Sequence, residues 1–277
     1  MIKVIDIDEL FDKYISDYVY KNIGKVKPEE IENQIPVLYE KFGDKKLSEL
    51  GGKTPNTYYK GFSACELIEC LKSHLEESVA VSDFLCEAIT SKEESEDALV
   101  KEIEKDCSEE FTIYAINMLG DLNSKKGAKI YLQFILWDYT DTIRELSTER
   151  LCEMAEIIKE DVILAYPDTD EKKKENLTEI LSNCKDDDRV YNILIEQFKK
   201  HTENMPLYAN YLAKYGDDRA LPVLIEAIED EKIKYSDFEE LRFAIEALGG
   251  TYDKARDFSA DKTFKKIRGM KNTKIIN

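Results

Sequence analysis

Apolar residues recur in this chain with the spacing of a helix face, and the whole pattern repeats along the second half of the chain. Four apolar residues at i, i+3, i+4 and i+7 occur at five successive sites, which are 111–118, 151–158, 177–184, 208–215 and 241–248. The interval between successive sites is that of repeat proteins, whose units are about 20–50 residues long. A strand would alternate with a period of two, so the spacing within each site favours helices. Gly (11) and Pro (6) are also scarce, which disfavours the many turns of a β-sandwich or barrel.

A second helix is predicted after most of these sites. The same template falls at 128–135, 191–198 and 221–228, and the last two of these segments correspond to each other at every position of the template. A single pair of helices cannot cover both of its apolar faces, whereas stacking the next pair covers them. The pattern therefore predicts an α-solenoid built from antiparallel helix pairs.

The residues between the predicted helices agree with helix pairing. Gly216 stands where the first helix of a pair must stop, and a left-handed residue at this position is usually Gly. Asp217 is placed to cap the next helix. A similar acidic cap, at residues 186–188, precedes the helix predicted at 191–198.

Residues 217–230 read Asp-Asp-Arg-Ala-Leu-Pro-Val-Leu-Ile-Glu-Ala-Ile-Glu-Asp, directly after a helix that ends near Gly216. This segment resembles a HEAT repeat, most of all the short bacterial kind also found in bilin-lyase-like proteins. The resemblance extends over about residues 108–268 and is clearest at 205–230. It departs from the family's pattern at 159–166, because Tyr166-Pro167 cuts the second helix short. The family is a binding architecture without shared catalytic residues.

We therefore expect an all-α protein with two parts. Residues 108–277 are predicted to form a HEAT-like repeat array, and residues 1–107 a less regular helical N-terminal region. The last segment, 254–277, contains eight Lys and Arg against two Asp, a balance of +6 that leaves −24 for residues 1–253. We expect this basic segment to cap the final repeat, with Phe258, Phe264 and Ile267 on its last apolar face. An arm that reaches toward an anionic partner is the alternative.

Charge limits the classes of partner. The formal net charge of −18 repels phosphate backbones, so broad binding of nucleic acid is disfavoured. It suits a protein partner, a basic one among the candidates, although an acidic surface also serves solubility alone. No apolar run approaches the roughly 20 residues of a membrane span, and no signal peptide is visible at the N-terminus. We expect a cytoplasmic protein that does not enter membranes.

No catalytic, metal-binding or cofactor-binding constellation is predicted. His74 and His201 each fall near a predicted helix end without a paired ligand at i+4, which is typical of surface or dipole contacts. The six cysteines lack a CxxC pair and are expected to be mostly buried thiols. The acidic runs 168–171 and 186–188 lack the twelve-residue calcium loop, so helix capping is the better interpretation.

The predicted function is a non-enzymatic protein–protein interaction scaffold or adaptor, of which an inhibitor or immunity protein for a basic protein is one form. In solenoids the second helix of each pair usually lines the inner wall. The partner-binding candidates are residues of those helices that lie away from the core template: Gln133, Trp137, Glu196, Lys200, Glu226 and Asp230. The alternative is a HEAT-fold enzyme, similar to a DNA glycosylase or a bilin lyase. A glycosylase would need a basic groove, which the acidic balance disfavours.

Overall fold

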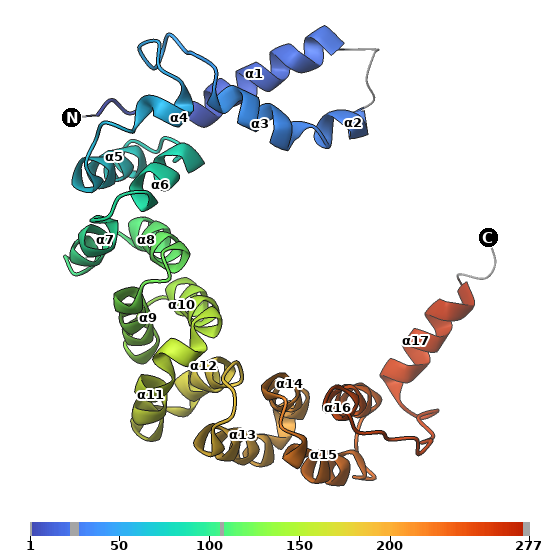
Figure 1. Ribbon diagram of the computed structural model, residues 1–277. Coiled ribbons are helices and arrows are strands. Elements are labelled where there is room, and N and C mark those ends of the chain that lie inside the picture. Colours follow the sequence, from blue (N-terminus) through green and yellow to red (C-terminus); the bar gives the residue numbers. More distant parts are fainter. Residues whose placement is uncertain (1, 23–27, 106–107, 274–277) are drawn as a thin grey trace. The chain divides into compact units, whose positions relative to one another are not determined.

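The computed structural model describes residues 2–22, 28–105 and 108–273 (Figure 1). Throughout these ranges the regular elements are helices and no strand occurs, which confirms the prediction of an all-α protein. Contacts divide the chain into two compact units, residues 1–130 (unit 1) and residues 131–277 (unit 2). The boundary predicted after residue 107 touches residues 106–107, which lie outside the described part, and it remains a prediction. None of the described helices combines the length and the apolar character needed to cross a bilayer.

The helices of unit 1 are short, and one that begins there, α9 (Lys125–Leu136), crosses the division between the units. In chain order the others are α1 (Ile7–Asn22), α2 (Pro28–Glu32), α3 (Ile35–Gly43), α4 (Pro55–Tyr58), α5 (Ala64–Glu76), α6 (Asp83–Thr90), α7 (Ser95–Ile103) and α8 (Glu109–Asp121). Helix α5 packs against α6, α7 and α8, and its template residues Leu67 and Leu71 are completely buried. Helix α1 packs against α3, where the Phe11 ring meets Tyr39 edge-on at 4.8 Å.

Unit 2 continues with α10 (Asp141–Glu153), α11 (Ala155–Ala165), α12 (Glu171–Leu181), α13 (Asp188–Lys200), α14 (Met205–Tyr215), α15 (Leu221–Ile228), α16 (Tyr235–Ala247) and α17 (Lys262–Thr273). Short 3-10 turns precede α12, α14 and α15 at Tyr166–Asp168, Thr202–Asn204 and Asp218–Ala220. The even-numbered helices contact one another in succession, α10 on α12, α12 on α14 and α14 on α16 (Figure 1). The odd-numbered helices pack beside this row, α11 on α12, α13 on α12 and α14, and α15 on α16.

The predicted turn chemistry is present between α14 and α15. Gly216 has a left-handed backbone with φ +84°, and the Asp217 carboxylate accepts the Arg219 N–H at 3.0 Å. The same cap occurs one pair earlier, where Asp187 accepts the Arg189 N–H at 2.9 Å. Each arginine also reaches back to the preceding pair, Arg189 to Glu160 at 2.6 Å and Arg219 to Asp188 at 2.8 Å. These contacts form a ladder that joins neighbouring pairs at equivalent positions.

One predicted helix is two helices. The template at 151–158 led us to expect a single helix face, and all four of its residues are indeed buried. The backbone nevertheless breaks at Met154, whose φ of −110° and ψ of 18° end α10 and begin α11. The prediction was wrong because side chains on both sides of a tight corner can enter one core. The early end of α11 at Ala165, before Tyr166-Pro167, was predicted correctly.

The segment after α16 packs against that helix. The Phe258 ring lies 5.3 Å from Tyr235 and 5.0 Å from Phe238, and it is 8% exposed. The Phe264 ring contacts Tyr235 at 5.0 Å, whereas Ile267 is 40% exposed. Two of the three apolar residues expected to cover the last helix pair are therefore in contact with it. The capping role itself remains a prediction, and residues 274–277 of this segment lie outside the described part.

Candidate functional site

The six residues predicted from the sequence to bind a partner all carry exposed side chains. Gln133 lies on α9, Glu196 and Lys200 on α13, and Glu226 on α15. Trp137 and Asp230 lie just after the last residues of α9 and α15. In unit 2 these positions belong to the odd-numbered helices rather than to the row α10–α12–α14–α16. Their role in binding remains a prediction.

Two of these six residues already have partners within the chain. The Lys200 ammonium lies 2.6 Å from Glu171, and the Asp230 carboxylate accepts the Lys232 N–H at 2.9 Å. The guanidinium of Arg256 in addition donates to the Asp230 carbonyl. Lys200 and Asp230 thus contribute to the structure of unit 2. Trp137 differs from them because its large apolar side chain is 57% exposed.

The even-numbered row carries a groove that the sequence did not indicate. It has a volume of about 490 Å³ and lies over α10, α12 and α14. Its lining consists of Glu145, Thr148, Glu149, Cys152 and Glu153 of α10, Asn176, Glu179 and Asn183 of the α12 region, and Lys214 of α14. We call this site the acidic groove. The α10 residues recur at i, i+3, i+4, i+7 and i+8, so they share one helix face.

The charges of the acidic groove are only partly neutralised. Glu153 lies 3.2 Å from the Arg150 guanidinium. Within the described residues, the carboxylates of Glu145, Glu149 and Glu179 form no ion pair, and Lys214 is the one basic residue that lines the groove. Glu145, Glu149 and Glu153 follow one another at steps of four, where like charges destabilise a helix by about 0.2–0.5 kcal/mol per pair. The three glutamates therefore repel one another along α10 and do not stabilise this helix.

The pKa values of two neighbouring groups are raised by burial and, in addition, by nearby glutamates. Burial raises the pKa of the Cys152 thiol to about 12, and the Glu179 carboxylate adds to that rise. Burial likewise raises the pKa of the Tyr211 hydroxyl, with further contributions from Glu179 and Glu175. Both groups resist acquiring a negative charge beside the glutamates. The negative field of the glutamates attracts cations such as the ammonium of lysine and the guanidinium of arginine.

The apolar spacing in the sequence did not indicate this groove because the core-facing side of α10 is partly polar. The side of α10 that faces the core includes Ile143, Ser147, Thr148 and Leu151, all buried. Two of these four are hydroxyl residues, so an apolar template does not detect the helix. The signal that could have found it is the repeat of glutamates at steps of four, which marks one face of a helix without reference to its core.

The side chains considered for catalysis or metal binding have structural contacts. His74 was expected at the surface but is 1% exposed, with Nδ1 2.8 Å from the Cys70 carbonyl oxygen. His201 is partly exposed and stacks on Tyr208 at 4.9 Å. Asp170 and Asp187 cap α12 and α13 as predicted. Among the residues that the structure describes, no group of His, Cys, Asp and Glu is arranged to hold a metal ion.

The cysteines agree with their prediction in part. Cys70 and Cys184 are buried, Cys86 and Cys152 are half-buried, and Cys65 is exposed, contrary to expectation. Cys65 lies in the first turn of α5, on the side away from the core residues Ala64, Leu67 and Ile68. Cys107 lies outside the described residues.

Comparison with known proteins finds no protein-family model, curated protein or solved structure that matches the chain.

Proposed function

We propose that this chain is a non-enzymatic protein-interaction module whose acidic groove binds a basic segment of a protein partner. The observation that carries the proposal is the set of three carboxylates, Glu145, Glu149 and Glu179, that line one groove without an ion pair among the described residues. A groove of about 490 Å³ suits a few inserted lysine or arginine side chains rather than a folded domain. Complementary charge of this kind gives a complex its specificity and speeds association.

The arrangement of unit 2 supports the wider interpretation that residues 108–277 include a HEAT-like α-solenoid. Its even-numbered helices contact one another in succession, and its odd-numbered helices pack beside them. Asp187 and Asp217 make the same cap in successive helix pairs, and Arg189 and Arg219 each reach back to the preceding pair. Repeating contacts between neighbours are what an array of repeats uses in place of one central core. Such arrays are suited to binding extended partners.

Affinity capture from the native cell tests the proposal. The groove variant carries Glu145→Lys, Glu149→Lys and Glu179→Lys. The matched control carries Asp161→Lys, Glu196→Lys and Glu226→Lys, which change the net charge by the same amount on exposed positions of α11, α13 and α15. Because the partner is attracted by the groove, we expect the groove variant to lose the proteins that the wild type captures. The control should retain them.

Two outcomes would contradict the proposal. If the control loses the partner and the groove variant retains it, the binding surface is the one predicted from the sequence, on α13 and α15. If both variants capture the partner as well as the wild type does, negative charge at these positions does not determine binding. Circular dichroism of each variant shows whether the helices are intact.

A further inference from the structure

An exposed phenylalanine lies on the same row of helices as the acidic groove. The Phe243 side chain of α16 is 67% exposed. Glu179 of α12, Asn210 of α14 and Phe243 each stand two residues after the first buried template residue of their helix. At 100° per residue this position lies on the side of the helix away from the buried template residues. Because α12, α14 and α16 contact one another in succession, the exposed sides of these helices adjoin.

The surroundings of Phe243 are acidic. Helix α16 carries four carboxylates against one arginine. Arg242 pairs with two of them, Glu239 at 2.9 Å and Glu246 at 3.8 Å. Glu240 is exposed and has no ion-pair partner in the part of the chain that the structure describes. It precedes Phe243 by three positions, so the two side chains are neighbours on one helix face.

An exposed ring beside an unpaired carboxylate fits an arginine side chain. A guanidinium stacks on an aromatic face and pairs with a carboxylate at the same time, which an aliphatic side chain cannot do. The ammonium of lysine is more strongly hydrated and gains less from contact with a ring. The chain itself contains this combination at Arg219, whose guanidinium lies 4.3 Å from the Tyr191 ring and 2.8 Å from the Asp188 carboxylate.

The surface between the acidic groove and Phe243 is not acidic. Helix α14 lies between α12 and α16 and contains no acidic residue, and its exposed side chains include Asn210 and Lys214. Lys214 repels cations, so uncharged residues of a partner fit this stretch best. Packed helices are about 8–10 Å apart, which places Glu179 and Phe243 roughly 16–20 Å from each other. An extended chain covers that distance in about five to six residues.

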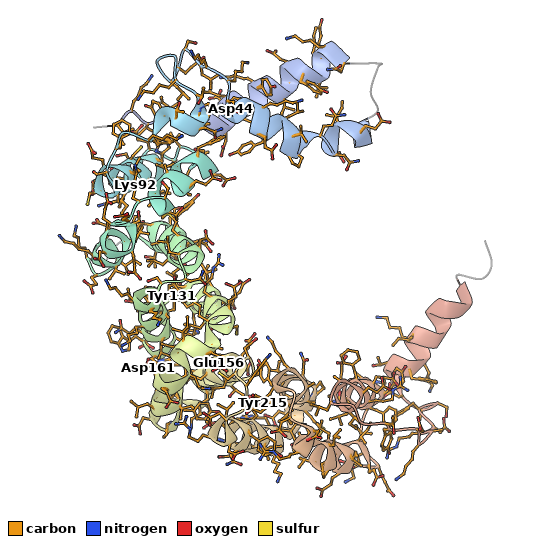
Figure 2. All side chains as sticks on the ribbon, in the orientation of Figure 1. Asp44, Lys92, Tyr131, Glu156, Asp161 and Tyr215 are labelled. Atoms are coloured by element: carbon orange, nitrogen blue, oxygen red, sulfur yellow. The ribbon has the colours of Figure 1, made fainter. Side chains whose placement is uncertain are left out.

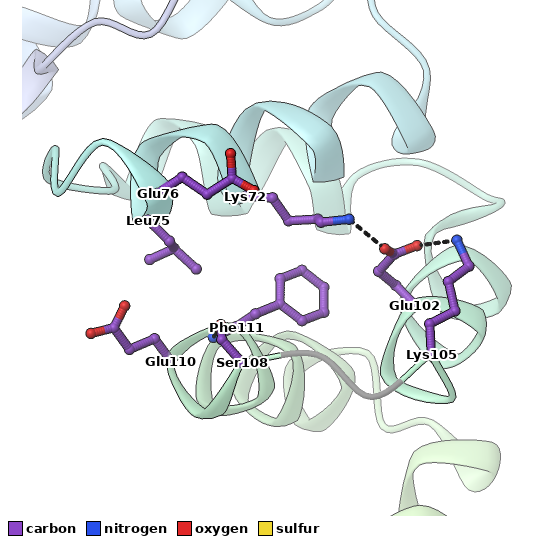
Figure 3. Close-up of a pocket in the computed structure, with 8 residues that line it drawn as sticks. All are labelled: Lys72, Leu75, Glu76, Glu102, Lys105, Ser108, Glu110 and Phe111. Atoms are coloured by element: carbon purple, nitrogen blue, oxygen red, sulfur yellow. Dashed lines mark hydrogen bonds and ion pairs between the residues drawn. The ribbon is translucent and has the colours of Figure 1, made fainter.

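The second hollow of the molecule, between α5, α7 and α8 of unit 1, differs in its charges (Figure 3). The Glu102 carboxylate in that hollow lies 2.6 Å from Lys72 and 2.7 Å from Lys105. Lys72 also pairs with Glu69, at 3.3 Å. The charges at that end of the hollow are therefore neutralised within the chain, whereas the glutamate charges along α10, α12 and α16 are largely available to a partner.

We propose that the exposed sides of α12, α14 and α16 extend the acidic groove into one docking surface for an extended segment of the partner. The segment has a basic cluster that is separated from an arginine by about five uncharged residues. The basic cluster lies in the groove beside Glu149 and Glu179, and the arginine stacks on Phe243 and pairs with Glu240. The inference rests on the proposed function of the groove and adds a second, specific contact to it.

Fluorescence anisotropy of labelled peptides mixed with the full chain at low ionic strength tests the proposal. The first peptide has three lysines, a spacer of about five glycine and serine residues, and one arginine. The second has glutamine in place of the arginine, and the third keeps the arginine but has a spacer of a single residue. The wild type should bind all three peptides through the groove, and only the first is able to reach Phe243.

Variants assign the arginine contact to α16. Phe243→Ala should weaken binding of the first peptide at least about threefold and leave the affinities for the other two unchanged. Glu240→Gln should act in the same direction. The matched controls are Leu164→Ala, which removes a side chain that is 79% exposed on α11, and Glu226→Gln on α15. Both controls should leave the affinities for all three peptides unchanged.

The outcomes separate this inference from the proposed function of the groove. If Phe243→Ala and Leu164→Ala bind the first peptide equally well, while the groove variant loses all three peptides, the inference is overturned and the proposed function stands. An equal loss of all three peptides in Phe243→Ala would overturn the inference too, because the effect would not depend on the arginine. If the wild type binds no peptide, or the groove variant binds them as tightly as the wild type does, both are overturned.

Discussion

The Tyr215 hydroxyl satisfies both main-chain groups of Asp187, a residue of the preceding helix pair. It accepts the Asp187 N–H at 2.8 Å and donates to the Asp187 carbonyl oxygen at 2.9 Å. Tyr215, labelled in Figure 2, ends α14, and Asp187 caps α13. One side chain thus fixes the cap of α13 to the end of the next helix. This contact and the arginine ladder join successive helix pairs through polar groups as well as through the core.

Tyr215→Phe should therefore destabilise unit 2. The substitution keeps the ring but leaves the Asp187 N–H without its partner, whereas the Asp187 carbonyl still accepts the Tyr191 N–H at 3.0 Å. The loss costs about 1–2 kcal/mol. Tyr191→Phe is the matched control, because the Tyr191 ring faces Arg219 at 4.3 Å and its hydroxyl has no hydrogen-bond partner among the described residues. Urea unfolding should show a loss for Tyr215→Phe and a change within about 0.5 kcal/mol for Tyr191→Phe. Equal effects would mean that the hydroxyl contact does not stabilise the pair.

Leu224→Ala and Glu226→Ala test the core register of α15. Leu224 is completely buried, and removing its side chain should cost about 2–5 kcal/mol. Glu226 lies on the same helix with an exposed side chain, and its removal should change stability by less than about 0.5 kcal/mol. The comparison is made by thermal or urea unfolding of the full chain. Small and similar losses of stability from both substitutions would show that a different face of α15 packs into the core.

Asp187 should titrate at unusually low pH. Its side-chain hydrogen bonds with Arg189 hold the pKa of the carboxyl at about 2, below the ordinary value of 3.8. A depressed pKa in the folded state adds stability that is complete above about pH 4 and is lost as the pH falls toward about 2. NMR titration of the Asp187 carboxyl should show this low midpoint in the wild type. In Arg189→Gln the midpoint should rise toward 3.8, and an unchanged midpoint would contradict the role of Arg189.

Much of the fold follows from the sequence because most of the core faces are apolar. The template residues at 177–184, 208–215 and 241–248 are all buried, as are Leu224 and Ile228 of α15. The helix caps could also be predicted from the sequence. Gly216 and Asp217 belong to residue types that are favoured at helix ends and at few other positions. Helix spacing and turn chemistry are local signals, and a single sequence contains them.

What the sequence could not supply depends on side chains from different helices. The acidic groove combines Glu145 and Glu149 of α10 with Glu179 of α12, and no single segment contains that combination. Lys72 and Glu102 pair across α5 and α7 for the same reason. The exposed candidates Glu196 and Glu226 were chosen because their positions repeat, which identifies equivalent places but not the face that binds. Local patterns predicted the elements, and packing decides which charges share a groove.

Removing residues 251–277 should lower the melting temperature and promote self-association. The deletion exposes Phe238 and Tyr235, which now contact Phe258, and the lost burial of Phe258 alone costs about 2 kcal/mol. For a chain of this size we expect a fall of at least about 5 °C. Removing only 268–277 is the control and should leave the melting temperature unchanged. A 251–277 deletion that melts normally but loses a captured partner would identify the segment as a binding arm instead of a cap.

Zero-length carbodiimide cross-linking of the native complex tests the central claim, because it joins carboxylates directly to lysine amines in contact with them. Mass spectrometry then identifies the joined residues. A partner bound in the acidic groove places its lysines within reach of Glu145, Glu149 and Glu179, and we expect cross-links at these residues, weakened by high salt. Cross-links confined to Glu196, Glu226 and Asp230, with none in the groove, would contradict the account and place the partner on α13 and α15.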